Sequence, residues 1–329
     1  MPQLRQNIIT SEWVVIAPER AARPSDFVTE DTIKTQSKEK CPFCLGKEAY
    51  ESRLKDLETK YIYVIPNKFP AFSPSGSEFE TQTYHVESNF FHARNSIGGH
   101  EVINIKEHDL DLPKFPQELM VDLFEVIKNR YQYYGKSEEN EYAMAIYNHG
   151  AAAAASIEHP HAQLFVSSIV PNYVRREMQG SEKYYFNNKA CIFCKLIEHE
   201  KQQGLRIIEE NEDFVAFTFY AARFPFETWI LPKAHESQFE NIDSAKIQSL
   251  AQILRAVLGQ LDKCLNDPPL NFFIHSLPYT VKDATYYHWH LEITPRVSKF
   301  GGYELGSGVI IDVVSPEKAA EYLRGGKES

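Results

Sequence analysis

The stretch that decides the fold is residues 148–164, which run Asn-His-Gly-Ala-Ala-Ala-Ala-Ala-Ser-Ile-Glu-His-Pro-His-Ala-Gln-Leu. Two of its three histidines, His159 and His161, are separated by one proline, and Gln163 follows two residues later. An alanine-rich helix with incidental histidines is the competing interpretation. That interpretation is disfavoured because Gly150 and the proline bracket the alanine run, and a β-type sequence follows. We therefore interpret the stretch as a reaction centre for phosphate chemistry.

The order of motifs around this stretch recurs in the second half of the chain. A C-x-x-C pair opens each half, and a helical segment and strands follow in the same order. The positions that match are Cys41 with Cys191, His108 with His235 and His159 with His288, at offsets of 150, 127 and 129 residues. The last two offsets are nearly equal, so the pattern indicates an internal repeat that is in register over its reactive part.

The apolar periodicity on either side predicts the elements of each copy. In the first half it predicts strands at 61–65, 99–105 and 142–147 and an amphipathic helix at 116–134. In the second half it predicts strands at 214–217, 271–275 and 288–293 and a helix at 244–265. We predict an α+β fold with two antiparallel sheets and flanking helices, divided into domains at 1–172, with the reaction centre, and 173–329, with a second metal site.

Composition limits the function classes that remain. The chain has 329 residues, of which 43% are hydrophobic, and a net charge of −10. Such a chain has no basic footprint for nucleic acid or an anionic membrane. No apolar run approaches the roughly 20 residues that span a bilayer, and the first 20 residues lack a signal-peptide pattern. We expect a soluble, cytoplasmic protein that binds neither nucleic acid nor membrane.

Four of the five cysteines form the two C-x-x-C pairs, a spacing that suits tetrahedral zinc. Each pair then needs two histidines, and the repeat singles out those with counterparts in the other half. A redox dithiol or a pair of unbonded thiols is the alternative, although neither pair lies in a thioredoxin-like context. Cys264 lies in the predicted helix and is expected to be a small core residue. The predicted zinc sites are Cys41, Cys44, His108 and His159, and Cys191, Cys194, His235 and His288.

The second histidine of the reaction centre is the predicted nucleophile. With His159 facing a metal, His161 lies two residues on in an extended segment, and the proline between them restricts the backbone. A neutral imidazole held in one tautomer can attack the α-phosphorus of a nucleotide and form a covalent phosphoramidate. Gln163 is expected to donate to a non-bridging oxygen, and Ser156 to contact the phosphate from another side. A second ligand role or a structural role is the alternative for His161.

The chain resembles the galactose-1-phosphate uridylyltransferases of the histidine-triad superfamily over nearly its whole length. The residues that carry the resemblance are Trp13-Val14, Arg20-x-x-Arg23-Pro24, Cys41-x-x-Cys44, Asn67, Asn148-x-Gly150, Ser156-x-x-His159-Pro160-His161-x-Gln163, His288-Trp289-His290 and Gly302-Tyr303-Glu304. The motif from Ser156 to Gln163 is quite specific, and the others are weak singly. The resemblance implies two histidine-triad-like units.

The resemblance also implies roles for individual residues. His161 matches the nucleophile that carries the nucleotidyl group, and Gln163 matches the glutamine that binds the phosphoryl oxygens. The residues that match positions holding the nucleotide sugar or its phosphates are Arg20, Arg23, Asn67, Asn148 and Ser156. Lys299, Phe300, Tyr303 and Glu304 resemble a C-terminal segment that reaches the sugar phosphate across a dimer interface, so a homodimer is implied. The spacing in that segment is one residue shorter than in the familiar form.

Alternatives to the leading prediction stay open for the metal and for the activity. Some family members hold iron through one glutamate and three histidines, and Glu177, His275, His288 and His290 match those positions. We favour the cysteine set and two zinc ions, because thiolates outcompete carboxylates for zinc.

The predicted activity is ping-pong uridylyl transfer from UDP-glucose to hexose 1-phosphate in galactose metabolism. The other candidates are an ADP-glucose phosphorylase, a histidine-triad nucleotide hydrolase or binding protein, and a zinc-binding interaction module.

Overall fold

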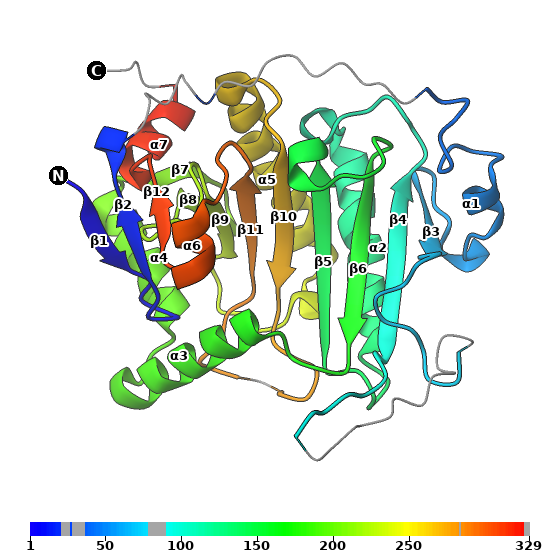
Figure 1. Ribbon diagram of the computed structural model, residues 1–329, viewed down its shortest axis with the longest axis horizontal. Helices are drawn as coiled ribbons and strands as arrows, with labels where there is room; N and C mark the ends of the chain where they lie inside the picture. The colour runs from blue at the N-terminus through cyan, green and yellow to red at the C-terminus, as the bar shows by residue number, and fades with distance from the viewer. Residues whose placement is uncertain (21–26, 28–36, 78–89, 283, 326–329) are drawn as a thin grey trace.

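The computed structural model describes residues 1–20, 27, 37–77, 90–282 and 284–325, and its centre is a nine-stranded antiparallel sheet (Figure 1). The strand order is β3-β4-β6-β5-β10-β11-β9-β8-β7. The bounds are β3 Ile62–Pro66, β4 Gly98–Ile105, β5 Tyr142–His149, β6 His161–Ser167, β7 Ile207–Glu210, β8 Phe214–Thr218, β9 Thr228–Pro232, β10 Leu270–His275 and β11 His290–Pro295. The predicted α+β class is confirmed.

Both halves of the chain contribute to this one sheet. Strands β3 to β6 come from the first half and β7 to β11 from the second, and the antiparallel pair β5–β10 joins them. In that pair Asn271 lies opposite Asn148, and its Nδ2 donates to Asn148 Oδ1 at 2.8 Å. A smaller three-stranded sheet forms beside the second half from β1 (Gln3–Gln6), β2 (Trp13–Ile16) and β12 (Ile310–Asp312), with β12 parallel to β2.

Two long helices cover one face of the large sheet. They are α2 (Gln117–Tyr134) and α5 (Ser244–Leu265), and they lie behind the sheet in Figure 1. Helix α5 begins where the side chain of Asp243 accepts a hydrogen bond from Lys246 N at 2.8 Å, which satisfies a helix-end donor. Its apolar stripe, including Leu250, Leu254 and Leu261, is fully buried against the strands. Both helices confirm the predicted ranges within one residue.

The opposite face of the sheet is covered mainly over the second half. Helix α4 (Ile192–Gln203) packs Phe193 and Leu196 against Phe217 and Trp229 in one buried cluster. The helix that precedes it, α3 (Asn172–Asn188), occupies residues where sequence analysis expected only a boundary. Of its three buried residues, Val174, Glu177 and Ser181, only the first is apolar, so the sequence offered no buried apolar run that would mark the helix. The remaining helices are α1 (Glu48–Glu51), α6 (Gly302–Ser307) and α7 (Pro316–Leu323).

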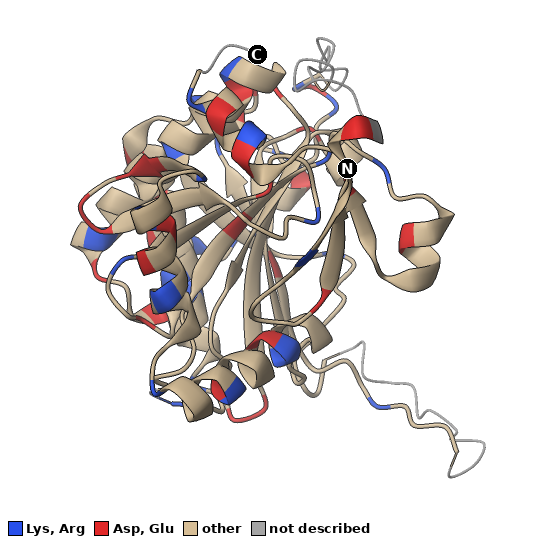
Figure 2. Ribbon diagram, turned by 90° about the vertical axis from the view of Figure 1, so that its left-hand side faces the viewer, with Lys and Arg blue, Asp and Glu red and all other residues tan. Residues whose placement is uncertain are grey.

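Along the ribbon in Figure 2, the positions of lysine and arginine are interspersed with those of aspartate and glutamate. This pattern agrees with the acidic net charge and with the lack of a basic footprint in the sequence. Within the described ranges, no helix is long and apolar enough to cross a membrane.

Candidate active site and metal centres

Strand β6 presents the predicted nucleophile on the face of the sheet that α2 and α5 leave uncovered. Its alternate residues Ala162 and Leu164 are fully buried in the core with those helices, so His161 and Gln163 point the other way. His161 Nδ1 lies 2.7 Å from the carbonyl oxygen of His159 and therefore donates its proton there. The lone pair of His161 is then on Nε2, the arrangement that a nitrogen nucleophile needs.

The surroundings of His161 keep it neutral. Its side chain is 7% exposed, and burial lowers its pKa, although the hydrogen bond to His159 opposes that shift. The ring of Phe43 meets the ring of His161 edge to face, with centroids 5.3 Å apart. Phe43 is itself held by Tyr63, which donates to its carbonyl oxygen. The C-x-x-C turn thus forms one wall around the predicted nucleophile.

The first predicted metal set converges on one point. The ligand atoms of Cys41, Cys44, His108 and His159 all lie within 4.8 Å of one another. The distances are 3.5 Å from Cys41 Sγ to His159 Nδ1, 3.3 Å from Cys44 Sγ to His108 Nδ1 and 3.2 Å between the two Nδ1 atoms. Tetrahedral zinc would give about 3.5 Å for sulfur to nitrogen and about 3.3 Å for nitrogen to nitrogen. The four residues fit a metal.

The environment of this set also favours a bound cation. His159 Nε2 lies 2.6 Å from the carbonyl oxygen of Ile105 and donates to it, which turns the Nδ1 lone pair toward the cysteines. Burial and the neighbouring Cys41 raise the pKa of Cys44 to about 11. A cation between the thiols would hold both as thiolates.

The second predicted set is assembled in the same way. Cys191, Cys194, His235 and His288 bring their ligand atoms within 4.8 Å of one another. Cys194 Sγ lies 3.4 Å from His235 Nδ1 and 3.6 Å from His288 Nδ1, while His288 Nε2 donates to the carbonyl oxygen of Pro232 at 2.9 Å. Ile105 and Pro232 are the last residues of β4 and β9, so the repeat extends to the backbone groups that orient the histidine ligands.

A third cluster of buried side chains lies beside the second set. Glu177, His275, His290 and Glu292 also bring one ligand atom each within 4.8 Å, and all four side chains are at most 3% exposed. The sequence suggested that His288 would have to serve either the cysteines or Glu177. The structure separates the two groups, because His288 faces the cysteines and Glu292 completes the carboxylate cluster.

The loop after β5 brings two predicted substrate residues together. Asn148 and Ser156 line a pocket of about 670 Å³ together with Gly150. Gly150 has φ +80°, and a Cβ there would meet Pro269 at 3.0 Å, so the turn requires glycine. Because Asn148 Oδ1 accepts from Asn271, the amide nitrogen of Asn148 is the group left to face a ligand.

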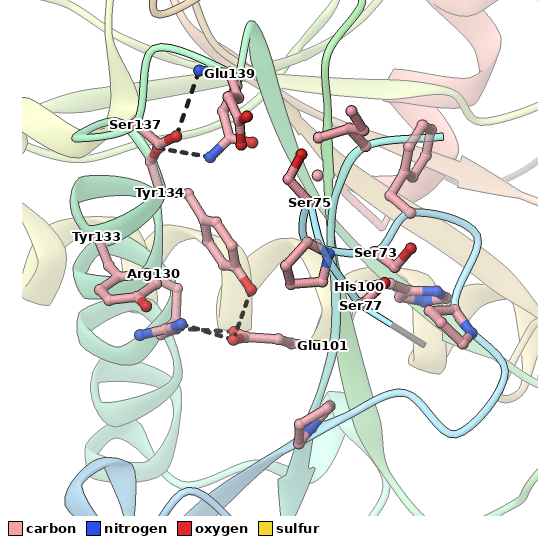
Figure 3. A pocket seen from close by; sticks show the side chains of 18 of the residues that line it. Ser73, Ser75, Ser77, His100, Glu101, Arg130, Tyr133, Tyr134, Ser137 and Glu139 are labelled. Atoms are coloured by element: carbon pink, nitrogen blue, oxygen red, sulfur yellow. Dashed lines mark hydrogen bonds and ion pairs between the residues drawn. The ribbon is translucent and has the colours of Figure 1, made fainter. Parts of the chain in front are cut away.

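A second pocket, of about 630 Å³, contains the predicted residue Asn67 and the unpredicted residue His100 (Figure 3). His100 Nε2 lies 3.0 Å from Gln163 Oε1 and 3.1 Å from Asn67 Nδ2. His100 therefore lies against the side-chain amides of both Asn67 and Gln163. In the sequence, His100 was marked only by its place in the predicted strand at 99–105.

The remaining predicted substrate residues lie elsewhere. Phe300 stacks on Phe224, with ring centroids 5.0 Å apart, and Glu304 accepts from the backbone of Gly301 at 2.9 Å. Tyr303 is 58% exposed on α6, and Lys299 precedes this helix. These four residues do not line either pocket described above. Arg23 lies outside the described residues, and Arg20 lies in a 3-10 turn at Pro18–Arg20 whose arginine side chain is not described.

Comparison with known proteins gives matches over both halves. Residues 1–171 match the family model described as "Galactose-1-phosphate uridyl transferase, N-terminal domain", and residues 177–325 match the corresponding C-terminal domain. An ADP-glucose phosphorylase of Arabidopsis thaliana is 33% identical over 98% of this chain and 92% of that protein. A galactose-1-phosphate uridylyltransferase of Thermotoga maritima is 26% identical over 98% of both chains.

Solved structures give the same picture. The crystal structure of an ADP-glucose phosphorylase from Arabidopsis thaliana with bound ADP-glucose has a TM-score of 0.82 and 29% identity, covering 100% of each chain. A uridylyltransferase structure, at 23% identity over 99% of this chain and 98% of that one, has a TM-score of 0.78 and shows the likeness of fold.

Proposed function

Because the chain belongs to the galactose-1-phosphate uridylyltransferase family, a family of nucleotidyltransferases, we propose that it transfers a nucleotidyl group through a covalent intermediate on His161. The leading proposal is uridylyl transfer from UDP-glucose to a hexose 1-phosphate, in galactose metabolism. The observation that supports it best is the tautomer of His161. Its Nδ1 is committed to the carbonyl of His159, so Nε2 holds the lone pair.

The proposed reaction has two displacements at the same phosphorus. In the first, His161 Nε2 attacks the α-phosphorus of the nucleotide sugar, an N–P bond forms, and the P–O bond to glucose 1-phosphate breaks. In the second, a phosphate oxygen of the acceptor attacks that phosphorus and the N–P bond breaks, which restores the neutral imidazole. The proposed role of Gln163 is to donate to a non-bridging oxygen as charge shifts in each transition state.

The proposed cofactors are two zinc ions per chain. The residues that would hold them are Cys41, Cys44, His108 and His159, and Cys191, Cys194, His235 and His288. Zinc at the first set would fix His159, whose carbonyl oxygen accepts the proton of His161. Iron bound through Glu177 is the less favoured assignment for the second half. Elemental analysis should find about two zinc ions per chain, as two four-ligand sites require.

A second candidate, ADP-glucose phosphorylase, is favoured by a specific observation. The relative of that name is 33% identical, compared with 26% for the Thermotoga maritima uridylyltransferase, at equal coverage of this chain. In this candidate, the same histidine would carry an adenylyl group from ADP-glucose to inorganic phosphate. The chemistry at His161 is shared by both candidates, and only the base and the acceptor differ.

We also propose that each chain consists of two histidine-triad-like units, residues 1–172 and 173–329, and that two chains form a cytoplasmic homodimer. The proposed ligands are small-molecule nucleotide sugars, and neither nucleic acid nor membrane is bound. The segment with Lys299, Phe300, Tyr303 and Glu304 does not reach the first-half pockets of its own chain. In the proposed dimer it would serve the partner's site.

The discriminating experiment uses UDP-glucose and ADP-glucose, each labelled in the α-phosphate of its nucleoside. The leading proposal predicts acid-labile label on the protein from UDP-glucose, and its release by hexose 1-phosphate. Label from ADP-glucose alone, released by inorganic phosphate, would establish the second candidate. Label from neither donor would contradict both and leave a nucleotide-binding or hydrolytic protein.

A further inference from the structure

His100 lies where the second pocket approaches the strand that holds the nucleophile. It is on β4, directly opposite Phe165 of β6, and is only 8% exposed. Its side chain projects from the sheet away from that of Glu101, which Arg130 and Tyr134 bind on the helix side (Figure 3). His100 therefore shares the face of the sheet that carries Gln163.

The backbone of a neighbouring loop fixes the tautomer of His100. The N–H of Ala71 lies 3.2 Å from His100 Nδ1, and a backbone amide can only donate. Nδ1 must then be the unprotonated nitrogen of the ring, which leaves the proton on Nε2. Burial lowers the pKa of His100, although its bond to Gln163 opposes that shift, so the ring stays neutral.

This tautomer decides the orientation of Gln163. An Nε2–H can only donate, so the atom that it meets at 3.0 Å must be the carbonyl oxygen of the Gln163 side chain. The amide nitrogen of Gln163 is thereby turned away from His100. The amide nitrogen of Asn67 lies 3.1 Å from the same Nε2, and its own oxygen accepts from Phe69 N at 2.9 Å. Because a protonated Nε2 cannot accept from Asn67, that 3.1 Å contact is not a hydrogen bond, and of the two amides the ring orients only that of Gln163.

The His100 ring is also held mechanically. The ring stacks on Phe165 with ring centroids 4.0 Å apart. The backbone carbonyl oxygen of His100 accepts from the backbone N–H of Asn67 at 2.8 Å. Phe165 is two residues beyond Gln163 on β6, so the same strand supports the ring and carries the amide that the ring orients. Such support restricts both side chains to one arrangement.

We propose that His100 is a positioning residue, which holds Gln163 with its amide nitrogen toward the phosphoryl group that His161 carries. The inference rests on the proposed nucleotidyl transfer, and it deepens it by naming the group that sets the direction of the donor. Without His100, the amide of Gln163 can turn over and present its oxygen to the phosphoryl oxygens, which repels them.

The kinetic test compares His100→Phe with His100→Gln. Phenylalanine keeps the stacking on Phe165 and removes the donor, and glutamine can place an N–H near the position of Nε2. We expect His100→Phe to lower the rate of covalent labelling about 10- to 100-fold with KM little changed, and His100→Gln to recover most of that loss. A rate within about twofold of wild type in His100→Phe, or an equal loss in both variants at unchanged folding, would overturn the proposal.

A double-variant cycle with Gln163→Ala separates orientation from general structural damage. If His100 acts through Gln163, adding His100→Phe to Gln163→Ala should cost no more than about a further twofold in rate. The same loss in both backgrounds would show that His100 acts independently of Gln163 and would contradict the proposal.

An independent measurement needs no substrate. Long-range 1H–15N NMR on the full-length protein, with His100→Phe to assign the resonances, reports which ring nitrogen carries the proton. We expect the proton on Nε2, and a proton on Nδ1 would overturn the proposal even if neither nucleotide sugar labels the protein. Failure of labelling in wild type would instead refute the proposed function, so the two failures are distinguishable.

Discussion

Strands β6 and β11 each begin at the second histidine of an equivalent pair, His159 and His161 or His288 and His290, and we propose that only the first pair reacts. His159 and His288 each donate from Nε2 to a carbonyl at the end of the neighbouring strand, at 2.6 and 2.9 Å. His161 and His290 each donate from Nδ1 to the carbonyl two residues before, at 2.7 and 3.1 Å. The repeat therefore gives the two histidine pairs the same tautomers. The pairs differ in the groups that surround Nε2 of His161 and of His290.

The difference lies at two equivalent positions. The offset of 129 residues between the histidines places Glu292 where the first half has Gln163, and the offset of 127 on the neighbouring strand places Glu227 where it has His100. The first pair is neutral and joined by one hydrogen bond of 3.0 Å. In the second pair Arg223 lies 2.6 Å from Glu292 and 3.6 Å from Glu227, so two buried carboxylates bound to a partly exposed arginine replace the donor.

Charge makes the second histidine unsuited to attack phosphorus. Its Nε2 lies 3.6 Å from Glu177 Oε1 and 3.4 Å from Glu292 Oε1. Burial opposes protonation, but these two carboxylates raise the pKa of His290 to about 10. The ring is also enclosed, since Glu177 reaches it from α3. The comparison teaches that a duplicated frame keeps its backbone contacts while the polar residues beside it decide whether it catalyses.

The largest effect should separate the two histidines themselves. His161→Asn should abolish covalent labelling by the nucleotide sugar, because no other nitrogen is in place to form the N–P bond. The matched variant His290→Asn should label within about tenfold of wild type per folded chain, since that ring takes no part. Labelling of His161→Asn at the wild-type level would refute the assignment of His161 as the nucleophile. Loss of labelling in both variants would contradict the proposal that only the first histidine pair reacts.

Exchanging the residue that follows each histidine should give the next largest effect. Gln163→Glu gives the first half the residue of the second, and we expect labelling to slow by about 10²- to 10³-fold because a donor is replaced by a negative charge. Glu292→Gln should leave the rate unchanged. A Gln163→Glu variant that labels at the wild-type rate would show that the amide is not needed.

Metal removal should distinguish the two cysteine sets. Cys44→Ser and Cys194→Ser should each reduce the zinc content from about two ions per chain to about one. We expect the first to slow labelling about 10- to 100-fold, because its set fixes His159 beside the nucleophile, and the second to leave the rate of folded protein nearly unchanged. Equal losses of rate would contradict the division of labour between the sets.

The sequence predicted the periodic parts of this molecule well. Helix α5 and strands β4, β5 and β10 were expected from apolar periodicity, and both cysteine sets were predicted from the spacing and the repeat. Helix α3 was not, because its role is to bring the polar residue Glu177 over the sheet rather than to bury an apolar stripe. His100 was missed because its partner Gln163 is 63 residues away and meets it only across paired strands, and Arg223 because its nearest carboxylate, Glu292, is 69 residues away.

A smaller effect on rate, with a large effect on stability, should come from the ion pair of the second half. Arg223→Met leaves Glu227 buried without a cation and Glu292 with His290 as a remaining partner, which should lower the free energy of unfolding by about 3 kcal/mol. The exposed pair Lys195–Glu198 offers a control, and Lys195→Met should leave the free energy of unfolding nearly unchanged. Denaturant unfolding measures both, and equal small changes would mean that the buried pair is not coupled to folding.

The smallest predicted effect is that of pH, because the labelling rate should hardly change near neutrality. Burial lowers the pKa of His161, so its Nε2 lone pair stays available until the pH falls below the usual value of about 6.5. The labelling rate should therefore be flat above that value and fall as acid protonates Nε2. A half-maximal rate well above pH 6.5 would contradict a neutral, buried nucleophile.

The most direct test of the account is the position and number of nucleotidyl groups on the wild-type chain. The protein is incubated with the nucleotide sugar that labels it, quenched at alkaline pH and analysed intact and as peptides by mass spectrometry. The account predicts a single nucleotidyl group per chain, attached to His161. A group on His290, or one group on each histidine, would show that both copies react and would contradict the central claim.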